Sequence, residues 1–554
     1  MLRYSLILTF ILSFFLLLEN SCQFIETPPN IFNKTVRDSV AQKYVTQQIE
    51  QELKKNEVVA TFKTRESDFL KQEFANFYKH TNNQLGWQNI IARGLSEQAK
   101  VFIKMLQNAE NQGLTSEKYH LSEIKKLADD IYSPFQPEQE NQVEQMANLD
   151  TKLTASAISY LSDVYSGSIK GGYKWEYPSK QQAIGEPLIK AIRYGGIEKM
   201  AANLSPTHKG FVGLQQKVTQ YRKIAENGGW QKISSNLGKE NIAILAKRLA
   251  EMDDLAAEKA SVTSFNADMK EAIKKYQKRH NFPISGSLDS KTLESLNEPI
   301  EEKIETMQLN MERYRWLPHA DSLGSRYVWV NIPEFMIKVY DAGKQVADIV
   351  GVVGEYKHAT PILIDRKLMN VIFSPVWNVP LSIAEEEMEY ILRNPAVLIV
   401  ADIDVFIDGK EVDPRDVDWE NTSRSRIRMK QKPKKSNSMG EAKFMFQNNH
   451  SIFLHDTPNQ HDFKNRIRSA SHGCVRVAEP KRLAIELLKG GNWSSGNIHA
   501  AMKKGKQTYA RLPQDVKVHI FYLTSWVDDE GVLQFRKDIY GHDKRHKKSL
   551  LASL

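Results

Sequence analysis

The chain contains only two cysteines, and their positions limit how its folded body can be held together. Cys22 stands at the end of a hydrophobic N-terminal run, which leaves Cys474 with no obvious disulfide partner in the folded body. The hydrophobic content of 41% is ample for a packed core, and a mean hydropathy of -0.48 argues against a protein with many membrane spans. At about 100–200 residues per domain, the 554 residues predict about three domains.

The residues around Cys474 are typical of a cysteine nucleophile. A histidine, His455, lies upstream, and the thiol itself stands in the run Ser469-Ala470-Ser471-His472-Gly473-Cys474-Val475-Arg476. In such a setting the thiolate attacks, an imidazole takes the thiol proton, and tight backbone leaves N–H groups for an oxyanion. The competing interpretation is a buried, inert cysteine, which is the commonest fate of a free thiol.

Separation along the sequence does not by itself bring His455 and Cys474 together. His455 directly follows the apolar stretch 452–454, which predicts a strand, and Cys474 directly precedes Val475-Arg476-Val477. Two strand ends on one face of a sheet would place the imidazole beside the thiol, and we expect this arrangement.

The N-terminus predicts export. Arg3 precedes an apolar run from Leu6 to Leu18, and polar residues follow up to Cys22, which is the layout of a secretory signal over residues 1–22. The run is short for a permanent anchor, which needs about 20 apolar residues. A lipoprotein signal with a lipidated Cys22 is the second interpretation, although Glu19 stands where an apolar residue is usual.

The net charge of +9 favours polyanionic partners, such as anionic lipid headgroups or an acidic wall polymer. No basic block with interleaved aromatic residues is present, so no nucleic-acid partner is expected. The basic runs Lys430–Lys435 and Lys544–Lys548 are interpreted as a solvated loop and a disordered end.

The first half of the chain is predicted to be helical. Apolar residues at spacings of three and four, as in residues 145–170, predict a mostly α-helical scaffold over residues 23–260. Residues 261–300 predict a small unit with a helix, a Pro/Gly turn and a second helix whose N-cap is Asp289 or Ser290.

The second half is predicted to be rich in strands. Short β-branched and aromatic runs predict a β-rich domain over residues 301–545, with a hairpin turn at Asp341–Lys344. The segment at about 381–442 interrupts these strands; it begins with an expected helix and continues as a polar, basic and irregular stretch. A long insertion of this kind is typical of a lid or a binding loop. Residues 546–554 are predicted as a basic tail.

Taken in order, the motifs are similar to those of the L,D-transpeptidases, which are bacterial cell-wall enzymes with a catalytic domain of the YkuD type. The histidine followed by Ser-His-Gly-Cys-Val-Arg resembles that catalytic domain, and residues 264–298 resemble the small peptidoglycan-binding domain of wall enzymes. The large multidomain periplasmic subgroup is the most similar, and its further motifs correspond here to Asp150–Thr154, Gly228–Trp230, Asn310–Pro318, Ala359–Pro361, Trp377–Pro380, Leu454–Pro458 and Gln534–Gly541.

The resemblance implies an α+β multidomain fold. It comprises an α-helical N-terminal scaffold, a small three-helix peptidoglycan-binding-like domain and a β-rich catalytic domain with a long inserted capping loop. It also implies an exported enzyme of the periplasm or envelope of a Gram-negative-type bacterium. Contact with the membrane is expected only through a lipid anchor at Cys22 or an uncleaved signal.

The activity implied by the resemblance is that of a peptidoglycan L,D-transpeptidase, an acyltransferase without metal or other cofactor. Cys474 would attack the L,D-peptide bond of a stem tetrapeptide, release D-Ala and remain as a thioester. The side-chain amine of a diamino acid in another stem would then take the acyl group. The product would be a 3→3 cross-link, which serves cell-wall biogenesis and cell shape, and the partners would be peptidoglycan stem peptides.

The resemblance also implies roles for the residues around the nucleophile. His455 would be the general base and acid, and a neutral imidazole suits this role near physiological pH. His472, Gly473 and Cys474 would shape the oxyanion site, mainly through backbone N–H groups. Ser471 would either orient its neighbours or take part in the chemistry. Acylation of Cys474 by carbapenems is expected on the same ground.

Three further residues are implied in substrate binding. Arg476 would hold a substrate carboxylate or form a structural ion pair, and Trp377 and Phe453 would line the donor groove.

Phe453 departs from the family, where tyrosine is frequent, so a hydroxyl contact is missing. The capping loop departs too: the family's Pro-Gly after a glutamine is replaced by lysine-rich sequence after Gln431.

Other functions remain open at the level of sequence. A zinc peptidase would draw its ligands from His455, Asp456, His461, His472 and Cys474, although no helical His-Glu-x-x-His is present. A non-catalytic wall-binding scaffold would rely on the helical block and on residues 264–298. Within the same thiol chemistry, water, a free D-amino acid or a protein lysine could replace the stem amine as acceptor, giving carboxypeptidase or exchange activity.

Overall fold

The computed structural model describes residues 46–47, 50–51, 67–89, 94–132, 142–169, 175–386 and 388–552. Two compact units are present, one formed by residues 1–170, 180–205 and 549–554 and the other by residues 171–179 and 206–548. The predicted signal over residues 1–22, with Cys22, lies outside the described residues. Among the described residues, no helix has the length and apolar character needed to cross a membrane.

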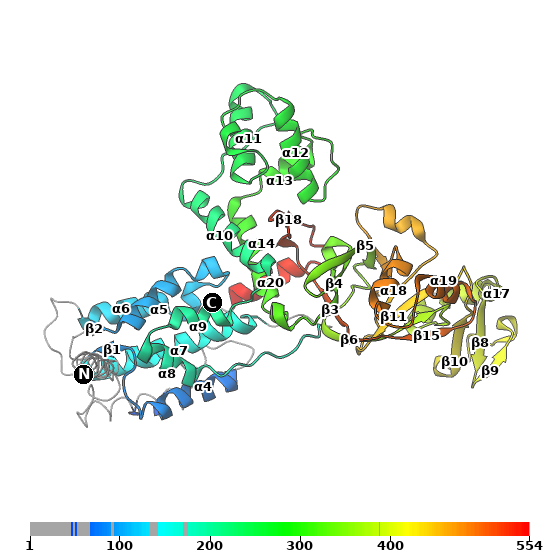
Figure 1. The fold of residues 1–554 in the computed structure, drawn as a ribbon, viewed down its shortest axis with the longest axis horizontal. Coiled ribbons are helices and arrows are strands. Elements are labelled where there is room, and N and C mark those ends of the chain that lie inside the picture. The colour runs from blue at the N-terminus through cyan, green and yellow to red at the C-terminus, as the bar shows by residue number, and fades with distance from the viewer. Residues whose placement is uncertain are drawn as a thin grey trace, which may run out of the picture. The chain divides into compact units, whose positions relative to one another are not determined.

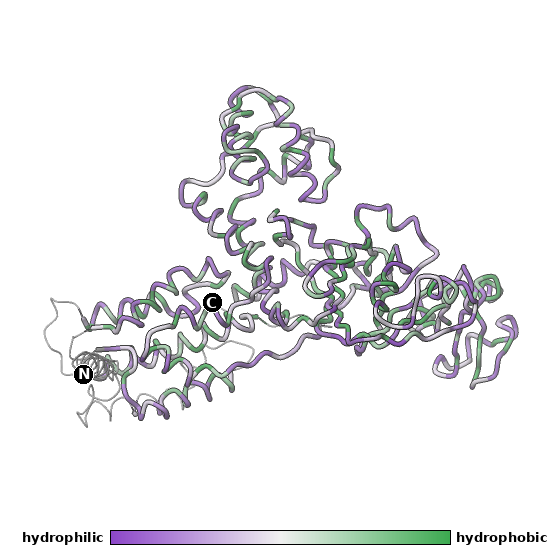
Figure 2. Tube along the Cα trace, in the orientation of Figure 1, coloured by the Kyte–Doolittle hydropathy of each residue, from purple (hydrophilic) through white to green (hydrophobic). Residues whose placement is uncertain are grey.

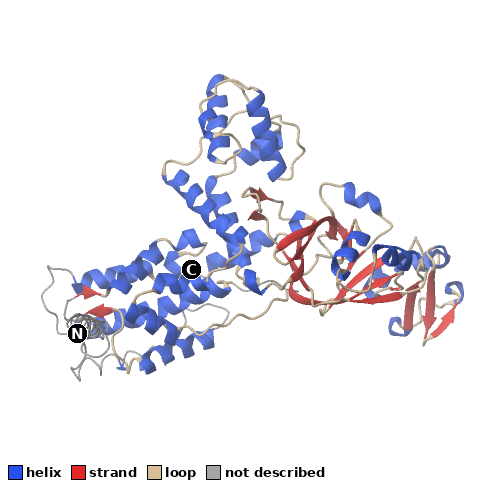
Figure 3. Cartoon of the chain, in the orientation of Figure 1, coloured by secondary structure: helices blue, strands red, loops and turns tan. Residues whose placement is uncertain are grey.

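In the described residues, the first unit is helical and the strands are gathered in the second, with one exception (Figure 3). A short pair, β1 (Gln88–Asn89) with β2 (Gly94–Leu95), is the exception. Hydrophobic and hydrophilic residues alternate along the helices, as expected for amphipathic packing (Figure 2). The helices are α4 (Ser67–His80), α5 (Glu97–Gln107), α6 (Leu121–Tyr132), α7 (Gln142–Ser166), α8 (Gly185–Tyr194) and α9 (Ile197–Leu204).

Helix α7 runs through the core of this unit, which confirms the helix predicted from the spacing of apolar residues (Figure 1). One turn of α7 carries a buried polar cluster. Asp150 accepts hydrogen bonds from the Tyr78 hydroxyl at 2.8 Å and from the backbone N–H groups of Gly86 and Trp87 at 2.9 Å each. Thr154 accepts from the Trp87 indole at 2.9 Å. The motif Asp150–Thr154 therefore joins the turn at residues 86–87 to the helical core.

The helical part of the second unit contains the small domain expected near residue 280. The helices of this helical part are α10 (Lys209–Glu226), α11 (Lys239–Glu251), α12 (Ala267–Arg279), α13 (Ser290–Leu296) and α14 (Ile300–Tyr314). Asp289 caps α13 by accepting from the backbone N–H of Thr292 at 2.8 Å, which confirms one of the two predicted caps. Gln277 is fully buried and accepts from the N–H groups of Ser285 and Gly286 at 2.9 Å each, so it fixes the turn.

The β-rich domain contains a sheet in the order β11-β12-β14-β5-β4-β3-β16-β6-β15. Because β6 also pairs with β11, these strands close on themselves. The two-residue loop Ala342-Gly343, with both φ angles positive, joins β4 to β5 and confirms the predicted hairpin. The strands are β3 (Arg326–Asn331), β4 (Met336–Asp341), β5 (Lys344–Gly354), β6 (Leu363–Phe373), β11 (Ala442–Phe446), β12 (Leu454–His455), β13 (Ser469–Ser471), β14 (Val475–Val477), β15 (Thr508–Arg511) and β16 (Lys517–Phe521).

The remaining elements of the domain lie outside this sheet. Two helices follow β14, and a short antiparallel pair of strands and a last helix end the described chain. These elements are α18 (Pro480–Leu488), α19 (Ser495–Lys503), β17 (Ser525–Val527), β18 (Leu533–Phe535) and α20 (His542–Ala552). The combination of helical and β-rich parts confirms the predicted α+β fold class.

The inserted segment is a subdomain with its own sheet and core, which corrects the expectation of an irregular stretch. Its apolar side chains pack together and include Val405, Ile427 and Met429. Its sheet has the order β7-β10-β8-β9. The elements are β7 (Trp377–Asn378), α15 (Leu381–Glu386), α16 (Met388–Arg393), α17 (Ala396–Val400), β8 (Ile403–Ile407), β9 (Lys410–Val412) and β10 (Ile427–Gln431).

The two basic runs also differ from expectation. Lys430 lies within strand β10, so the first part of the run Lys430–Lys435 belongs to a sheet rather than to a loop. Lys544–Lys548 lies within helix α20 rather than in a disordered end. In that helix His546 is buried against Trp175 and Trp316, which explains why the segment is ordered.

Candidate active site

The sheet places His455 and Cys474 on neighbouring strands. Strands β12 and β14 pair in parallel, with Leu454 opposite Val475 and His455 opposite Arg476. Cys474 directly precedes β14 and is two residues from Arg476. Because side chains two residues apart point to the same side of a strand, Cys474, Arg476 and His455 share one face. This is the arrangement of strand ends expected from the sequence.

One nitrogen of His455 is fixed by a hydrogen bond. The Nδ1 atom lies 2.5 Å from the backbone carbonyl oxygen of Asp456. A carbonyl oxygen only accepts, so in the neutral ring Nδ1 carries the proton and Nε2 carries the lone pair. The pKa of His455 is lowered to about 3, mainly by burial and to a smaller extent by the positive charges of Arg476 and Lys443, against the raising effect of the Asp456 hydrogen bond. The imidazole is therefore neutral at pH 7, with its lone pair on Nε2.

The Cys474 thiol is also neutral in the resting structure. Burial raises its pKa to about 11, although a backbone hydrogen bond from Phe453 and the charges of Lys443 and Arg476 act in the opposite direction. Its Sγ atom lies 3.8 Å from the backbone oxygen of Ser451. The site therefore holds a thiol and a neutral imidazole rather than a preformed thiolate–imidazolium pair.

The loop before the nucleophile is fixed by short hydrogen bonds. The Ser471 hydroxyl donates to the Cys474 carbonyl at 2.5 Å and accepts from the Gly473 N–H at 3.2 Å. The Ser471 hydroxyl thus bridges the backbone of Gly473 and Cys474. The Gly473 N–H is directed to this hydroxyl, so a role in the oxyanion site would require that bond to open.

Two residues outside the loop support its backbone. The Thr360 hydroxyl donates to the Gly473 carbonyl and accepts from the Gly354 N–H, both at 2.8 Å. The Tyr540 hydroxyl donates to the Gly354 carbonyl at 2.5 Å and accepts from the Thr360 N–H at 3.2 Å. A Cβ atom at Gly354 would lie 2.0 Å from the carbonyl oxygen of His358. This close approach explains why glycine stands at the end of β5.

Arg476 forms a structural ion pair. Its Nη1 atom lies 2.7 Å from Asp462 Oδ2, and the two side chains are only 15% and 12% exposed. Of the two roles left open for this arginine, the structure shows the pair. In this structure the guanidinium also acts on the pKa of both His455 and Cys474.

Lys443 belongs to the site and was missed by sequence reasoning. It lies on β11 directly opposite His455, and its Nζ atom is 3.7 Å from the centre of the Phe453 ring. Burial lowers the pKa of this lysine, while Cys474 raises it. Apolar residues alternate with it along residues 442–446, so it had the appearance of an ordinary solvent-facing position of an amphipathic strand.

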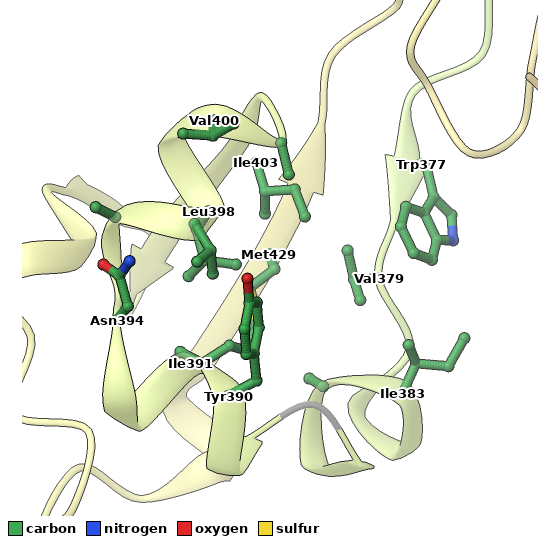
Figure 4. A pocket seen from close by; sticks show the side chains of 14 residues that line it. Trp377, Val379, Ile383, Tyr390, Ile391, Asn394, Leu398, Val400, Ile403 and Met429 are labelled. Atoms are coloured by element: carbon green, nitrogen blue, oxygen red, sulfur yellow. The ribbon is translucent and has the colours of Figure 1, made fainter.

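The two aromatic residues expected in the donor groove lie in different surroundings. Phe453 is buried and meets the His455 ring edge to face, with centroids 5.6 Å apart. Trp377 lines a cavity of about 500 Å³ in the inserted subdomain (Figure 4). Figure 4 shows Trp377 and Val379 on one side of this cavity, facing Leu398 and Ile403. The cavity is largely apolar, and its lining includes the polar side chains of Asn394 and Tyr390.

His472 is exposed and faces the inserted subdomain. Its Nε2 atom lies 3.5 Å from Glu386 Oε2, and Glu386 Oε2 is 3.4 Å from His358 Nε2. Among the described residues, these three form the one group of histidine, cysteine or carboxylate side chains with ligand atoms close enough to share an ion. Only His472 comes from the five residues considered for a zinc peptidase, so the structure does not assemble that set.

Comparison with known proteins matches three regions of the chain. Residues 325–520 match the L,D-transpeptidase catalytic domain, residues 72–217 match the scaffold domain, and residues 238–296 match the family described as "Putative peptidoglycan binding domain". The last match begins before residue 261, where the small domain was expected to start, and includes α11. The resemblance found in the sequence is confirmed by these matches.

Two individual proteins are also similar. A Haemophilus influenzae protein named "Putative L,D-transpeptidase" is 29% identical over 241 residues, which cover 43% of this chain and 48% of that protein. The chain thus spans about half the length of this relative. A crystal structure of an L,D-transpeptidase from Stackebrandtia nassauensis is 14% identical with a TM-score of 0.20, covering 53% of this chain and 96% of that one.

Proposed function

Because the chain carries the catalytic domain of the L,D-transpeptidase family, we propose that it is a peptidoglycan L,D-transpeptidase with Cys474 as nucleophile and His455 as general base. The observation that carries this proposal is the pairing of β12 with β14, together with the bond from His455 Nδ1 to the Asp456 carbonyl. The pairing sets His455 and Cys474 on one face of neighbouring strands, and the bond leaves the Nε2 lone pair for the proposed proton transfer.

The first half-reaction forms an acyl-enzyme. Cys474 Sγ attacks the carbonyl carbon of the L,D-peptide bond in a stem tetrapeptide while His455 Nε2 takes the thiol proton. Proton transfer during the attack suits a resting site in which both groups are neutral. The peptide C–N bond then breaks, the departing D-Ala amine receives the proton from His455, and the stem remains as a thioester on Cys474.

The second half-reaction transfers the stem. The side-chain amine of a diamino acid in a neighbouring stem attacks the thioester carbon, and His455 Nε2 takes a proton from it. The C–S bond breaks, Cys474 regains its proton, and the new amide is a 3→3 cross-link. The backbone N–H groups of His472 and Cys474 are the proposed oxyanion donors, since that of Gly473 is engaged by Ser471.

The other domains support a role at the cell wall. The catalytic and peptidoglycan-binding domains favour peptidoglycan as substrate and an exported, wall-associated protein. We propose that stem peptides are the donor and acceptor and that the protein works in the periplasm, with a cleaved or lipid-carrying N-terminus. The apolar cavity beside Trp377 is the proposed donor-side contact of the inserted subdomain. Carbapenems are expected to acylate Cys474 and add their mass to the folded protein.

The experiment that tests this function is incubation of the protein with a disaccharide-tetrapeptide, with the products identified by mass spectrometry. The transpeptidase proposal predicts loss of D-Ala together with 3→3 dimers, and neither product from the Cys474→Ala variant. Loss of D-Ala without dimers would show a carboxypeptidase, and D-amino-acid incorporation would show exchange. Unchanged substrate with both proteins, combined with retention on wall sacculi, would support the wall-binding scaffold instead.

A further inference from the structure

Three side chains from separate parts of the chain meet where the inserted subdomain faces the loop of the nucleophile. His472 belongs to that loop, His358 lies between β5 and β6, and Glu386 is the last residue of α15 in the insertion. The nitrogen atoms Nε2 of both histidines are directed to the same carboxylate oxygen, at 3.5 Å and 3.4 Å. The two rings lie 4.8 Å apart, centre to centre.

We infer that His358, Glu386 and His472 form a binding site for a borderline divalent cation such as Zn²⁺. Two imidazole nitrogens and one carboxylate oxygen are ligands that zinc prefers, and three protein ligands leave one position for water. With zinc–ligand bonds of about 2.0–2.2 Å, two ligands of a tetrahedral site lie about 3.4 Å apart. The nitrogen–oxygen distances of 3.4 and 3.5 Å in this group match that spacing.

The neighbourhood of the group favours a cation. Glu355 places Oε1 3.7 Å from the same His358 nitrogen, so two carboxylates face the two histidines. The ordinary explanation for such a cluster is a pair of His–Glu contacts at an exposed surface. That explanation accounts for each contact separately, whereas a shared ion accounts for the convergence of both rings on one oxygen. This site is distinct from the thiol chemistry and goes beyond the proposed transpeptidase reaction.

A bound ion would connect the inserted subdomain to the catalytic loop. Glu386 is the contribution of the insertion, and both histidines belong to the β-rich domain. Zinc would therefore restrain α15 against the residues next to Cys474, and substrate access to the nucleophile would depend on the ion. The proposed ligand is the divalent cation by itself, and its binding does not require substrate.

The binding test uses ZnCl₂ and isothermal titration calorimetry on the full chain, purified without a histidine tag. All proteins carry Cys474→Ala, which removes the thiol as a competing ligand and makes binding independent of turnover. Cys474→Ala alone is expected to bind one zinc ion per chain. Adding His358→Gln or Glu386→Gln should weaken binding by more than about tenfold, because loss of an outer-shell partner alone costs that much. Adding His461→Gln, at an exposed histidine outside the group, should leave binding unchanged.

Two results would overturn the site. One is the absence of zinc binding to the Cys474→Ala protein, and the other is equal binding by the His358→Gln and His461→Gln proteins. The connection to the insertion is tested by hydrogen–deuterium exchange over residues 383–393. Zinc should slow exchange there in the Cys474→Ala protein and should have no effect once Glu386→Gln is added. Zinc binding without slower exchange would overturn the restraint on α15.

Discussion

The Nδ1 atom of His455 lies 2.5 Å from the carbonyl oxygen of Asp456. This one contact decides which nitrogen of the ring carries the proton, and so which nitrogen can serve the thiol. The contact is made to the backbone of the next residue in the chain, so consecutive residues supply the base and set its tautomer.

The first prediction concerns pH. Because burial raises the pKa of Cys474 to about 11 and lowers that of His455 to about 3, both groups stay neutral between these values. Alkylation by iodoacetamide needs the thiolate, so its rate should rise about tenfold per pH unit from about pH 7 to 10. Release of D-Ala in a single turnover depends on general-base catalysis and should change less than about threefold between pH 6 and 9. Equal pH slopes for the two rates would instead indicate a preformed thiolate.

The second prediction concerns Lys443. Its positive charge lowers the pKa of Cys474, so Lys443→Met should raise that pKa further. Alkylation at pH 9 should slow by about threefold to tenfold, which corresponds to a pKa change of up to about one unit. Lys443→Arg should keep most of the wild-type rate. The matched control is Lys367→Met, which replaces a lysine of β6 that is paired with Asp515. An unchanged rate in Lys443→Met would show that this lysine has no electrostatic effect on the thiol.

The third prediction concerns the pair of Arg476 with Asp462. A double-mutant cycle with Arg476→Gln and Asp462→Asn should give a coupling free energy of about 1–3 kcal/mol in urea unfolding, because both partners are largely buried. Each single variant should raise KM to a similar extent, since each disturbs the same pair. A large rise of KM in Arg476→Gln alone, with no coupling in stability, would show that the arginine holds a substrate carboxylate instead.

The fourth prediction concerns the first unit. Burial raises the pKa of Asp150 from 3.8 to about 6, even though four hydrogen bonds act in the opposite direction. The folded state therefore binds a proton that the unfolded state has lost between these values, and stability falls as pH rises through them. A shift of about two units corresponds to about 3 kcal/mol.

Calorimetric unfolding at several pH values measures this effect. Wild type should lose stability between about pH 4 and 7, and Asp150→Asn, which cannot ionise, should lose much less. Asp130→Asn, at a solvent-accessible aspartate of α6, should behave as wild type. Parallel pH curves for wild type and Asp150→Asn would refute the assignment of the effect to this carboxyl group.

Local sequence signals were sufficient where one short segment determines the structure. The hairpin at Ala342-Gly343 and the cap at Asp289 follow from residues that lie next to each other in the chain. His455 and Cys474 could be expected on one face of a sheet because each is adjacent to a short apolar run, and these two runs pair as β12 and β14.

Features built from distant residues could not be read in this way. The core of the inserted subdomain joins Val405 to Met429, and strand β10 alternates apolar residues with Arg428 and Lys430, so its basic content obscured its period of two. Lys443 acquires its role only through pairing with β12. The meeting of His358 with Glu386 likewise depends on how the insertion folds back to the catalytic loop.

The measurement that tests the central claim most directly is the intact mass of the protein after brief reaction with a disaccharide-tetrapeptide and acid quench. An acyl-enzyme on Cys474 predicts a mass gain equal to the substrate less D-Ala, located on the peptide that contains Cys474 and removed by hydroxylamine, as expected of a thioester. The Cys474→Ala protein should show no gain. An unmodified wild-type protein that still releases D-Ala, or an equal adduct on the Cys474→Ala protein, would contradict the account.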